Sequence, residues 1–288
     1  MLRLSCMLLV LSATFLNAGE APPQYPIQTN VVYGRTGGED LKLNLAVPKE
    51  GDGPFPLLIF IHGGGWAAGD KFSYNGAIRE WAQKGYVAAT VGYRFAPVHK
   101  FPAQVEDVKC AVRYLRSRAK ELKIDVAKVG AIGDSAGGHL SLMLGLMDSV
   151  DGLEGDGGSP GVSSKVQAVI NYYGPTDFTV KHEIAKNPMV MTLISNFLGS
   201  TDQTQPVFKQ ASPVSYITKG DAAVLTFQGT ADPLVPHEQA RHLHDELKKA
   251  GLTEKLEILE GAGHGFSGAV KARTVKMTEE FLNEQFKK

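Results

Sequence analysis

The amino-acid sequence predicts an α/β fold, with a mostly parallel sheet of about eight strands covered by helices on both faces. Two observations support this prediction. Short apolar stretches alternate along the chain with stretches of helical periodicity, as they do in repeated strand–helix units. The 288 residues are 43% hydrophobic, which is enough to build one substantial core around such a sheet.

The expected strands differ in the burial that their sequences imply. LKLNLAV (41–47) alternates between apolar and polar residues, which is typical of a half-buried strand. PLLIFI (56–61) is apolar throughout, as expected of a strand covered on both faces. We expect the first two strands to be antiparallel. In chain order, the expected strands cover residues 31–34, 41–47, 56–61, 86–93, 128–133, 166–174, 222–229 and 255–261.

The stretches between these strands carry apolar residues at helical spacing. In the segment 102–122, for example, Val105, Val108, Val112 and Leu115 fall on one face of a helix. In chain order, the expected helices cover residues 74–84, 102–122, 136–147, 236–250 and 270–286.

The N-terminus has the composition of a secretory signal peptide. Arg3 supplies a positive charge, residues 4–16 are mostly apolar, and Ala18 offers a small residue at a cleavage point before Gly19. The apolar run is short for a membrane span. We therefore expect residues 1–18 to be removed from a secreted or periplasmic protein without stable membrane association, with an uncleaved anchor as the alternative.

Residues 19–288 are expected to form the α/β domain. Cys6 lies in the signal, so Cys110 is the single cysteine of the mature chain and an intrachain disulfide is excluded. Residues 178–210 break the strand–helix rhythm, and we interpret them as a small lid-like insertion at one end of the sheet.

A Gly-rich, acidic loop at 151–164 also breaks the rhythm. Carboxylates at Asp148, Asp151, Glu154 and Asp156 raise the question of calcium, but their spacing does not match a calcium-binding loop. We expect a solvated, flexible turn there and no metal site. Thirty basic and thirty acidic side chains balance, and no basic block appears, which argues against a nucleic-acid partner.

A candidate nucleophile lies between an expected strand and an expected helix. The segment GDSAG places Ser135 in a G-x-S-x-G pattern, and the strand–turn–helix context is that of a nucleophile elbow. In such a turn, strand and helix approach so closely that Gly133 and Gly137 cannot be replaced by bulky residues. Ser135 is therefore the expected catalytic nucleophile.

The segment HGGGW follows a buried strand, and its glycines can expose backbone N–H groups to an oxyanion. We expect the N–H groups of Gly64, Gly65 and Ala136 to form an oxyanion hole. His62 precedes the glycines and is expected to fix the loop rather than act as a base. Trp66 is expected to bind substrate, although for Trp66 and Tyr93 a purely packing role stays open.

A serine hydroxyl needs a base, and His264 is the expected one. It lies in GAGHGF, after the last expected strand. His139, one helical turn after Ser135, is expected to be a packed histidine. Three histidines of the helix 236–250 are expected at the surface, and two in loops are left undetermined; these are His237, His242, His244, His99 and His182.

Asp232 is the expected acid that orients this base, because it directly follows a strand that we expect next to the strand before His264. Asp177, after the preceding strand, is the alternative. Asp134 and Asp107 are expected to have structural roles.

With these segments in place, the chain resembles the α/β-hydrolase superfamily in its HGGG-containing branch, which includes the hormone-sensitive-lipase-like esterases. HGGGW, GYRFAP, GDSAGGHL, YYGPTDF, ADPLVP and GAGHGF occur in the order of that family. Within the branch it is most similar to bifunctional feruloyl/acetyl-xylan esterase-like proteins. The resemblance implies Ser135, Asp232 and His264 as the triad. Only about 40 residues precede HGGGW in the mature chain, so an N-terminal helical cap is not expected.

The residues and the resemblance together predict a secreted serine carboxylester hydrolase that acts without cofactor or metal. Short acyl esters, of acetyl or feruloyl type and carried by carbohydrates, are the expected substrates. Two alternatives stay open: an amidase or formamidase with the same triad, and a non-catalytic binding protein on the same fold. The sequence leaves the oligomeric state open, and a monomer is compatible with it.

Overall fold

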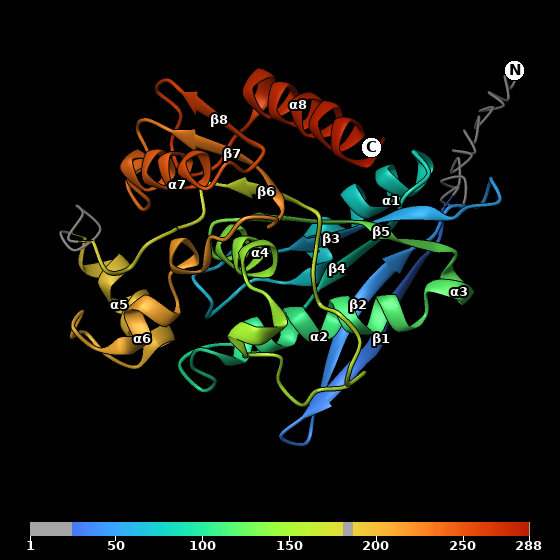
Figure 1. Ribbon diagram of the computed structural model, residues 1–288, viewed down its shortest axis with the longest axis horizontal. Helices are drawn as coiled ribbons and strands as arrows, with labels where there is room; N and C mark the ends of the chain where they lie inside the picture. The colour runs from blue at the N-terminus through green and yellow to red at the C-terminus, as the bar shows by residue number, and fades with distance from the viewer. Residues whose placement is uncertain (1–24, 181–186, 288) are drawn as a thin grey trace, which may run out of the picture.

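The computed structural model describes residues 25–180 and 187–287. Its centre is an eight-stranded sheet with the strand order β1-β2-β4-β3-β5-β6-β7-β8 (Figure 1). The expected signal segment and Cys6 lie outside the described residues, as does His182. The strands are β1 (Ile27–Thr36), β2 (Glu39–Ala46), β3 (Phe55–Ile61), β4 (Val87–Val91), β5 (Ile124–Asp134), β6 (Ala168–Tyr172), β7 (Ala223–Gly229) and β8 (Glu254–Leu259).

The sheet is parallel except at one end, as predicted. β1 pairs antiparallel with β2, β2 pairs antiparallel with β4, and the five remaining pairs are parallel. Because β4 lies outside β3, the strand order reverses between β3 and β5. The carboxyl ends of β3, β5, β7 and β8 then meet at one edge of the sheet, which is where ligands bind in open α/β folds.

Helices cover both faces of the sheet (Figure 1). Helices α1 and α8 lie on one face, whereas α2, α4 and α7 pack on the other. Every residue of α4 is buried, because this helix lies beneath other elements as well as on the sheet. The helices are α1 (Asn75–Gln83), α2 (Ala103–Ser117), α3 (Ala119–Leu122), α4 (Ala136–Leu146), α5 (Pro188–Leu198), α6 (Pro206–Gln210), α7 (His237–Lys249) and α8 (Gly268–Phe286).

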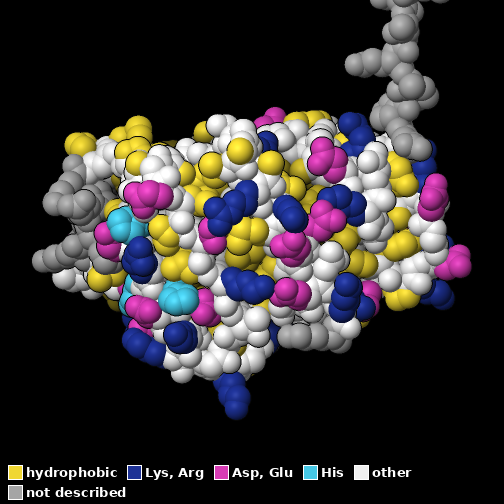
Figure 2. Space-filling model, turned by 90° about the horizontal axis from the view of Figure 1, so that it is seen from above, with side chains coloured by type: hydrophobic (Ala, Val, Ile, Leu, Met, Phe, Trp, Pro, Cys, Tyr) yellow, Lys and Arg dark blue, Asp and Glu magenta, His cyan; other side chains and the backbone are white. Residues whose placement is uncertain are grey.

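Figure 2 views the molecule from the side of α8, where Lys and Arg side chains alternate with Asp and Glu. Three ion pairs join α8 to its neighbours: Lys84 with Glu279, Lys255 with Glu284, and Arg273 with Glu257. Within the described ranges, no helix combines the length and the apolar character needed to cross a membrane.

Several element boundaries differ from those predicted. The expected helix 102–122 is divided, because α2 ends at Ser117 and the short α3 follows it. Lys123 then takes a left-handed φ of 53°, and β5 begins at once with Ile124 rather than near residue 128. β1 is also longer than predicted, because its exposed residues pair with β2 although they carry no alternating apolar pattern.

The acidic loop is not the flexible turn that its composition indicates. The carboxylate of Glu154 accepts hydrogen bonds from Lys109 Nζ at 3.0 Å and from Arg113 Nη1 at 2.6 Å, and both cations are buried on α2. Gly157 O accepts from the N–H of Arg35 in β1. The loop composition gives no sign of this anchoring, because its partners Lys109 and Arg113 lie more than 40 residues away on α2.

Candidate active site

Ser135 occupies the sharp turn between β5 and α4. Its φ of 53° lies in the left-handed region, which is strained for a residue with a side chain. Glycines make this turn possible. A Cβ at Gly133 would lie 2.2 Å from the carbonyl oxygen of Gly137, and one at Gly137 would lie 2.0 Å from that of Ile61. The contact between strand and helix therefore leaves no room for a side chain at either position.

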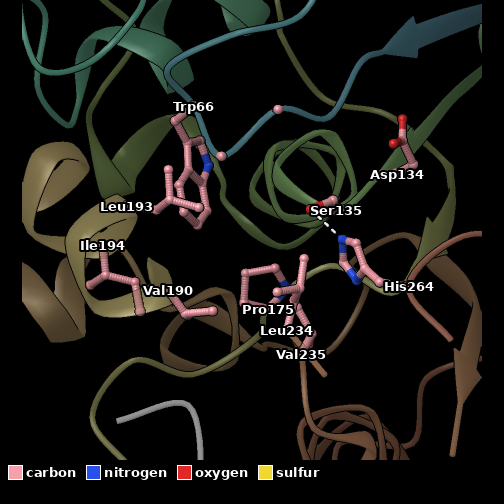
Figure 3. Close-up of a pocket in the computed structure, with 12 residues that line it drawn as sticks. Trp66, Asp134, Ser135, Pro175, Val190, Leu193, Ile194, Leu234, Val235 and His264 are labelled. Carbon is pink, nitrogen blue, oxygen red and sulfur yellow. Dashed lines mark hydrogen bonds between the residues drawn. The ribbon is translucent and has the colours of Figure 1, made fainter. Parts of the chain in front are cut away.

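The structure brings Ser135, His264 and Asp232 together in series. The hydroxyl of Ser135 lies 2.9 Å from His264 Nε2 (Figure 3). His264 Nδ1 lies 2.8 Å from Asp232 Oδ2. Ser135 follows β5, His264 follows β8 and Asp232 follows β7. The strand ends at this edge thus bring together Ser135 and His264, which are 129 residues apart, and His264 and Asp232, which are 32 residues apart.

Asp232 is held as a carboxylate. Burial alone would raise its pKa, but hydrogen bonds from His264, from the N–H of Val235 and from the N–H of Leu234 outweigh burial and lower the pKa. Those backbone donors occupy Oδ1, at 2.9 and 2.8 Å, which leaves Oδ2 for the imidazole. Gln228 Nε2 also donates to Oδ2, at 3.1 Å.

Asp177, the alternative acid, belongs to a different cluster. Its Oδ1 accepts hydrogen bonds from the N–H and the hydroxyl of Thr179, at 2.8 and 2.7 Å. Its Oδ2 lies 3.2 Å from Nε2 of His242 on α7. The structure thus uses Asp177 to fix the start of the insertion.

The predicted oxyanion donors lie next to the serine. Ala136 is the first residue of α4, and the first N–H groups of a helix have no intrahelical acceptor. Gly64 and Gly65 have φ of 114° and 59° in the turn that follows β3, and both line the same cavity as Ser135. The N–H of Gly63, by contrast, donates to Asp134 Oδ1 at 3.1 Å.

Asp134 points away from Ser135 (Figure 3). Besides the N–H of Gly63, its Oδ1 accepts a hydrogen bond from the hydroxyl of Tyr74, at 2.6 Å. One carboxylate therefore ties the elbow to the glycine loop, which is a structural role of the kind expected for Asp134. Asp107 is also structural, because it pairs with Arg94 at 2.8 Å and accepts from the backbone N–H of Arg94.

His62 and Tyr93 support the glycine loop by packing. Their rings stack with centroids 4.5 Å apart, and the hydroxyl of Tyr93 donates to the carbonyl oxygen of His62 at 2.9 Å. Burial lowers the pKa of His62, so this histidine is neutral at neutral pH. Tyr93 packs behind the loop and does not line the cavity at Ser135.

A cavity of about 300 Å³ opens beside the Ser135 hydroxyl (Figure 3). Its far wall is apolar and comes largely from α5 and from the loop after Asp232. Trp66 lines it and is otherwise packed, so the packing role is present, while substrate binding by Trp66 stays a prediction. The apolar lining residues are Trp66, Pro175, Val190, Leu193, Ile194, Leu234 and Val235.

Sequence reasoning expected residues 178–210 and Trp66 to shape the site, but it singled out no other residue of this wall and missed two supports of the triad. The apolar face of α5, MVMTLI, was the available signal for Val190, Leu193 and Ile194. No sequence signal identified Gln228. Tyr173 was also missed: its ring lies 4.7 Å from that of His264, on a backbone with φ of 43°.

The remaining histidines among the described residues lie away from the cavity or behind it. His139 is fully buried, as expected for a packed residue. The three histidines of α7 are half-buried and pair with carboxylates, His244 with Glu254 for example. In the part of the chain that the structure describes, no three His, Cys, Asp or Glu side chains gather closely enough to hold a metal ion.

The profile of a family described as BD-FAE matches residues 43–247, which is more than half of the chain. The chain belongs to the BD-FAE family. The matched span includes Ser135 and Asp232, and the resemblance to HGGG-containing α/β-hydrolases is thereby confirmed at the level of the family.

The relatives and structures most similar to this BD-FAE chain include named esterases. It is 32% identical to esterase LipC of Mycobacterium tuberculosis over 237 residues, which cover 80% of this chain and 59% of LipC. It therefore spans little more than half the length of that curated relative.

Two solved structures share the fold over nearly their whole length. A truncated carbohydrate esterase from gut microbiota superposes with a TM-score of 0.82 at 28% identity, covering 93% of this chain and 99% of that one. Esterase Est2 of Thermogutta terrifontis, with propionate bound, gives a TM-score of 0.74 at 29% identity, covering 91% and 94%. The predicted α/β-hydrolase fold is confirmed by these likenesses.

Proposed function

We propose that this BD-FAE chain is a serine carboxylic ester hydrolase that cleaves short acyl esters of carbohydrates. The observation that carries the proposal is the contact series at the sheet edge. Ser135 Oγ lies 2.9 Å from His264 Nε2, and His264 Nδ1 lies 2.8 Å from Asp232 Oδ2. A hydroxyl, an imidazole and a buried carboxylate in this order form the machinery of nucleophilic acyl transfer.

In the first half of the reaction, Ser135 Oγ attacks the ester carbonyl while its proton passes to His264 Nε2. Asp232 fixes the tautomer with the proton on Nδ1, and its negative charge stabilises the imidazolium that forms. The tetrahedral intermediate then breaks its bond to the leaving oxygen, and His264 returns the proton to that oxygen. The products of this half are an alcohol and an acyl ester on Ser135.

In the second half, a water molecule replaces the alcohol. His264 takes a proton from the water while the water oxygen attacks the acyl carbonyl. His264 then protonates Ser135 Oγ as the carboxylic acid leaves. In both halves the carbonyl oxygen becomes an anion. We assign its stabilisation to the N–H groups of Gly64 and Gly65, which border the cavity beside Ser135, and to that of Ala136, the first residue of α4.

The cavity supports a short acyl group as the buried part of the substrate. Its volume of about 300 Å³ and its apolar wall suit an acyl chain rather than a polar sugar ring. The carbohydrate half of the proposal rests on the similarity to the gut carbohydrate esterase. Propionate bound to Est2 is consistent with a short acyl group.

The test compares the mature chain with a Ser135→Ala variant on p-nitrophenyl acetate, acetylated xylan, a feruloyl ester and an N-formyl amide. We expect ester hydrolysis that falls about 10⁴-fold or more in the variant while its folding is unchanged. Full activity of Ser135→Ala would refute the assignment. Faster turnover of the amide than of the esters would instead identify an amidase.

A fluorophosphonate probe separates an enzyme from a binding protein on the same fold. The probe reacts with an activated serine, so we expect an adduct on Ser135 that is absent from Ser135→Ala. A folded wild-type protein that forms no adduct would favour the non-catalytic alternative.

We also propose that residues 1–18 direct export. Arg3, the apolar run 4–16 and Ala18 support this proposal. Mass spectrometry of the protein recovered from its own host should give a mature N-terminus at Gly19. Recovery of the intact N-terminus in a membrane fraction would favour an uncleaved anchor.

A further inference from the structure

Trp66, His139 and Ala211 form a hydrogen-bonded chain behind the apolar cavity. Trp66 ends the HGGGW loop, His139 lies one turn into α4, and Ala211 follows α6 directly after the insertion. Trp66 Nε1 donates to His139 Nδ1 at 3.2 Å, and His139 Nε2 lies 2.7 Å from the carbonyl oxygen of Ala211. One imidazole thus joins three segments that are far apart in the sequence.

The partners of this imidazole determine its protonation. An indole N–H can only donate, so His139 Nδ1 must be the acceptor and carry no proton. His139 Nε2 then carries the proton and donates to Ala211 O. Both ring nitrogens are satisfied in one tautomer only, at a site where the His139 side chain has no exposed surface.

The indole that His139 holds is part of the cavity wall. Its ring stacks on Phe197 of α5 with centroids 4.3 Å apart and an interplanar angle of 7°. Its other side faces the cavity together with Leu193 and Ile194 (Figure 3). Trp66 is also the largest side chain of that wall, so a shift of the indole changes the space available to an acyl group.

The backbone conformation of Trp66 is strained, so contacts of its side chain are needed to hold the residue in place. Its φ is 58°, a left-handed conformation that costs energy in a residue with a side chain and persists only where surrounding contacts hold it. His139 supplies the hydrogen-bond acceptor for the indole, which also makes ring contacts with Phe178 and Phe197. Loss of this acceptor would leave a buried N–H without a partner.

We infer that His139 is a positioning residue that fixes the indole of Trp66 and thereby sets the preference of the enzyme for acyl-chain length. The inference rests on the proposed esterase function. An acetyl group ends close to Ser135, whereas a longer chain extends along the wall and contacts the indole. The orientation of the indole therefore matters for longer chains and much less for acetyl.

The kinetic test measures kcat/KM for p-nitrophenyl butyrate and p-nitrophenyl acetate and compares their ratio between variants. His139→Leu removes both hydrogen bonds, and we expect the butyrate-to-acetate ratio to fall about fivefold or more. His139→Asn places an acceptor where Nδ1 lies and should restore most of the ratio. His139→Gln keeps a donor toward Ala211 but no acceptor for Trp66, and should not restore it.

Ser141→Ala is the matched control. Ser141 is buried on the same helix and donates a hydrogen bond to Gly137 O at 2.8 Å, but its partner is not Trp66. This variant should lose stability without a change of the butyrate-to-acetate ratio. A double-mutant cycle adds to the control: in a Trp66→Phe background His139→Leu should no longer change the ratio, because phenylalanine has no side-chain N–H to donate to His139.

Fluorescence tests the position of the indole independently of catalysis. The chain has two tryptophans, so Trp81→Phe leaves Trp66 as the single emitter. In that background His139→Leu should shift the emission to the red and increase quenching by acrylamide, whereas His139→Asn should not. An unchanged emission with an unchanged ratio in a folded His139→Leu variant would overturn the inference. A fluorescence change without any ester hydrolysis by the wild type would instead refute the proposed function.

Discussion

At the scale of single residues, the site depends on a carboxylate that stays ionised inside the protein. Asp232 has no exposed side-chain surface, and burial opposes its charge. Donors from His264, Val235 and Leu234 reverse that effect and lower its pKa. The group that orients the base therefore keeps its charge well below neutral pH.

Asp232→Asn tests this role. The amide can donate a proton toward His264 Nδ1 and so favour the wrong tautomer, and we expect kcat for acetate esters to fall about 10⁴-fold. Circular dichroism should show a folded protein. Asp177→Asn is the control, because its partners are Thr179 and His242, so its effect should be on stability. A larger loss of kcat in Asp177→Asn than in Asp232→Asn would exchange the two assignments.

His139 links the folding stability to pH. Burial lowers its pKa to about 4, from an ordinary value of 6.5, despite the hydrogen bond to Ala211. Below pH 6.5 the unfolded chain binds a proton that the folded chain rejects until about pH 4. Stability is therefore complete above pH 6.5 and falls as the pH decreases through this window.

We expect His139 to account for about 2 kcal/mol of the unfolding free energy lost between about pH 7.5 and about pH 5. Urea unfolding of the wild type and of His139→Asn at both pH values measures it, because asparagine does not titrate. The loss should be smaller in the variant by that amount. Equal losses in both proteins would mean that the ring is protonated in the fold.

At the scale of elements, the turn between β5 and α4 has the tightest geometry in the site. A Cβ at Gly137 would meet the backbone oxygen of Ile61, the last residue of β3, and no side-chain rotation can relieve that contact. The nucleophile is therefore positioned by a contact among β3, β5 and α4.

Gly137→Ala should destabilise the fold by about 3 kcal/mol or more, because β3 and α4 must separate. Gly76→Ala is the matched control in α1, where a Cβ would meet nothing within 4 Å. There the same change should raise the unfolding free energy by about 0.5 kcal/mol, through the higher helix propensity of alanine. Denaturant unfolding gives both values, and similar effects of the two changes would contradict the steric account.

Elements with strong local signals were predictable from the sequence, whereas long-range contacts were not. The apolar run of β3 and the glycines around Ser135 express constraints that lie within a few residues. The partners of Asp232 illustrate the limit: Gln228 resembles any strand residue until the loop after β7 folds back on it. The division of the helix after Ser117 was missed for a similar reason, since the helical spacing continues through Leu122.

At the scale of the whole molecule, the Glu154 carboxylate anchors the acidic loop 151–164 on α2. Glu154 pairs with Lys109 and Arg113 of α2, and Ser164 Oγ donates to it at 2.8 Å. The same loop accepts the N–H of Arg35 from β1. Thus β1, the strand farthest from Ser135 in strand order, is joined by a backbone hydrogen bond to a loop that buried charges anchor on α2.

Glu154→Gln should lower the unfolding free energy by about 3 kcal/mol, because two buried cations lose their counter-charge. Glu280→Gln on α8 is the control; its pair with Lys276 is exposed, and the change should cost less than about 0.5 kcal/mol. Thermal melts at low and high salt would distinguish the two ion pairs, because salt screens the exposed pair more than the buried one. Equal shifts in the two variants would mean that solvent reaches Lys109 and Arg113.

The wall of the cavity that α5 supplies belongs to one continuous stretch of chain between β6 and β7. On the proposed function, replacing this stretch would therefore change which acyl groups the cavity admits, while Ser135 and His264 stay in place. A grafted segment need only return the chain at residue 211 with its carbonyl oxygen facing His139, because the contact to α4 there uses a main-chain atom that every amino acid possesses.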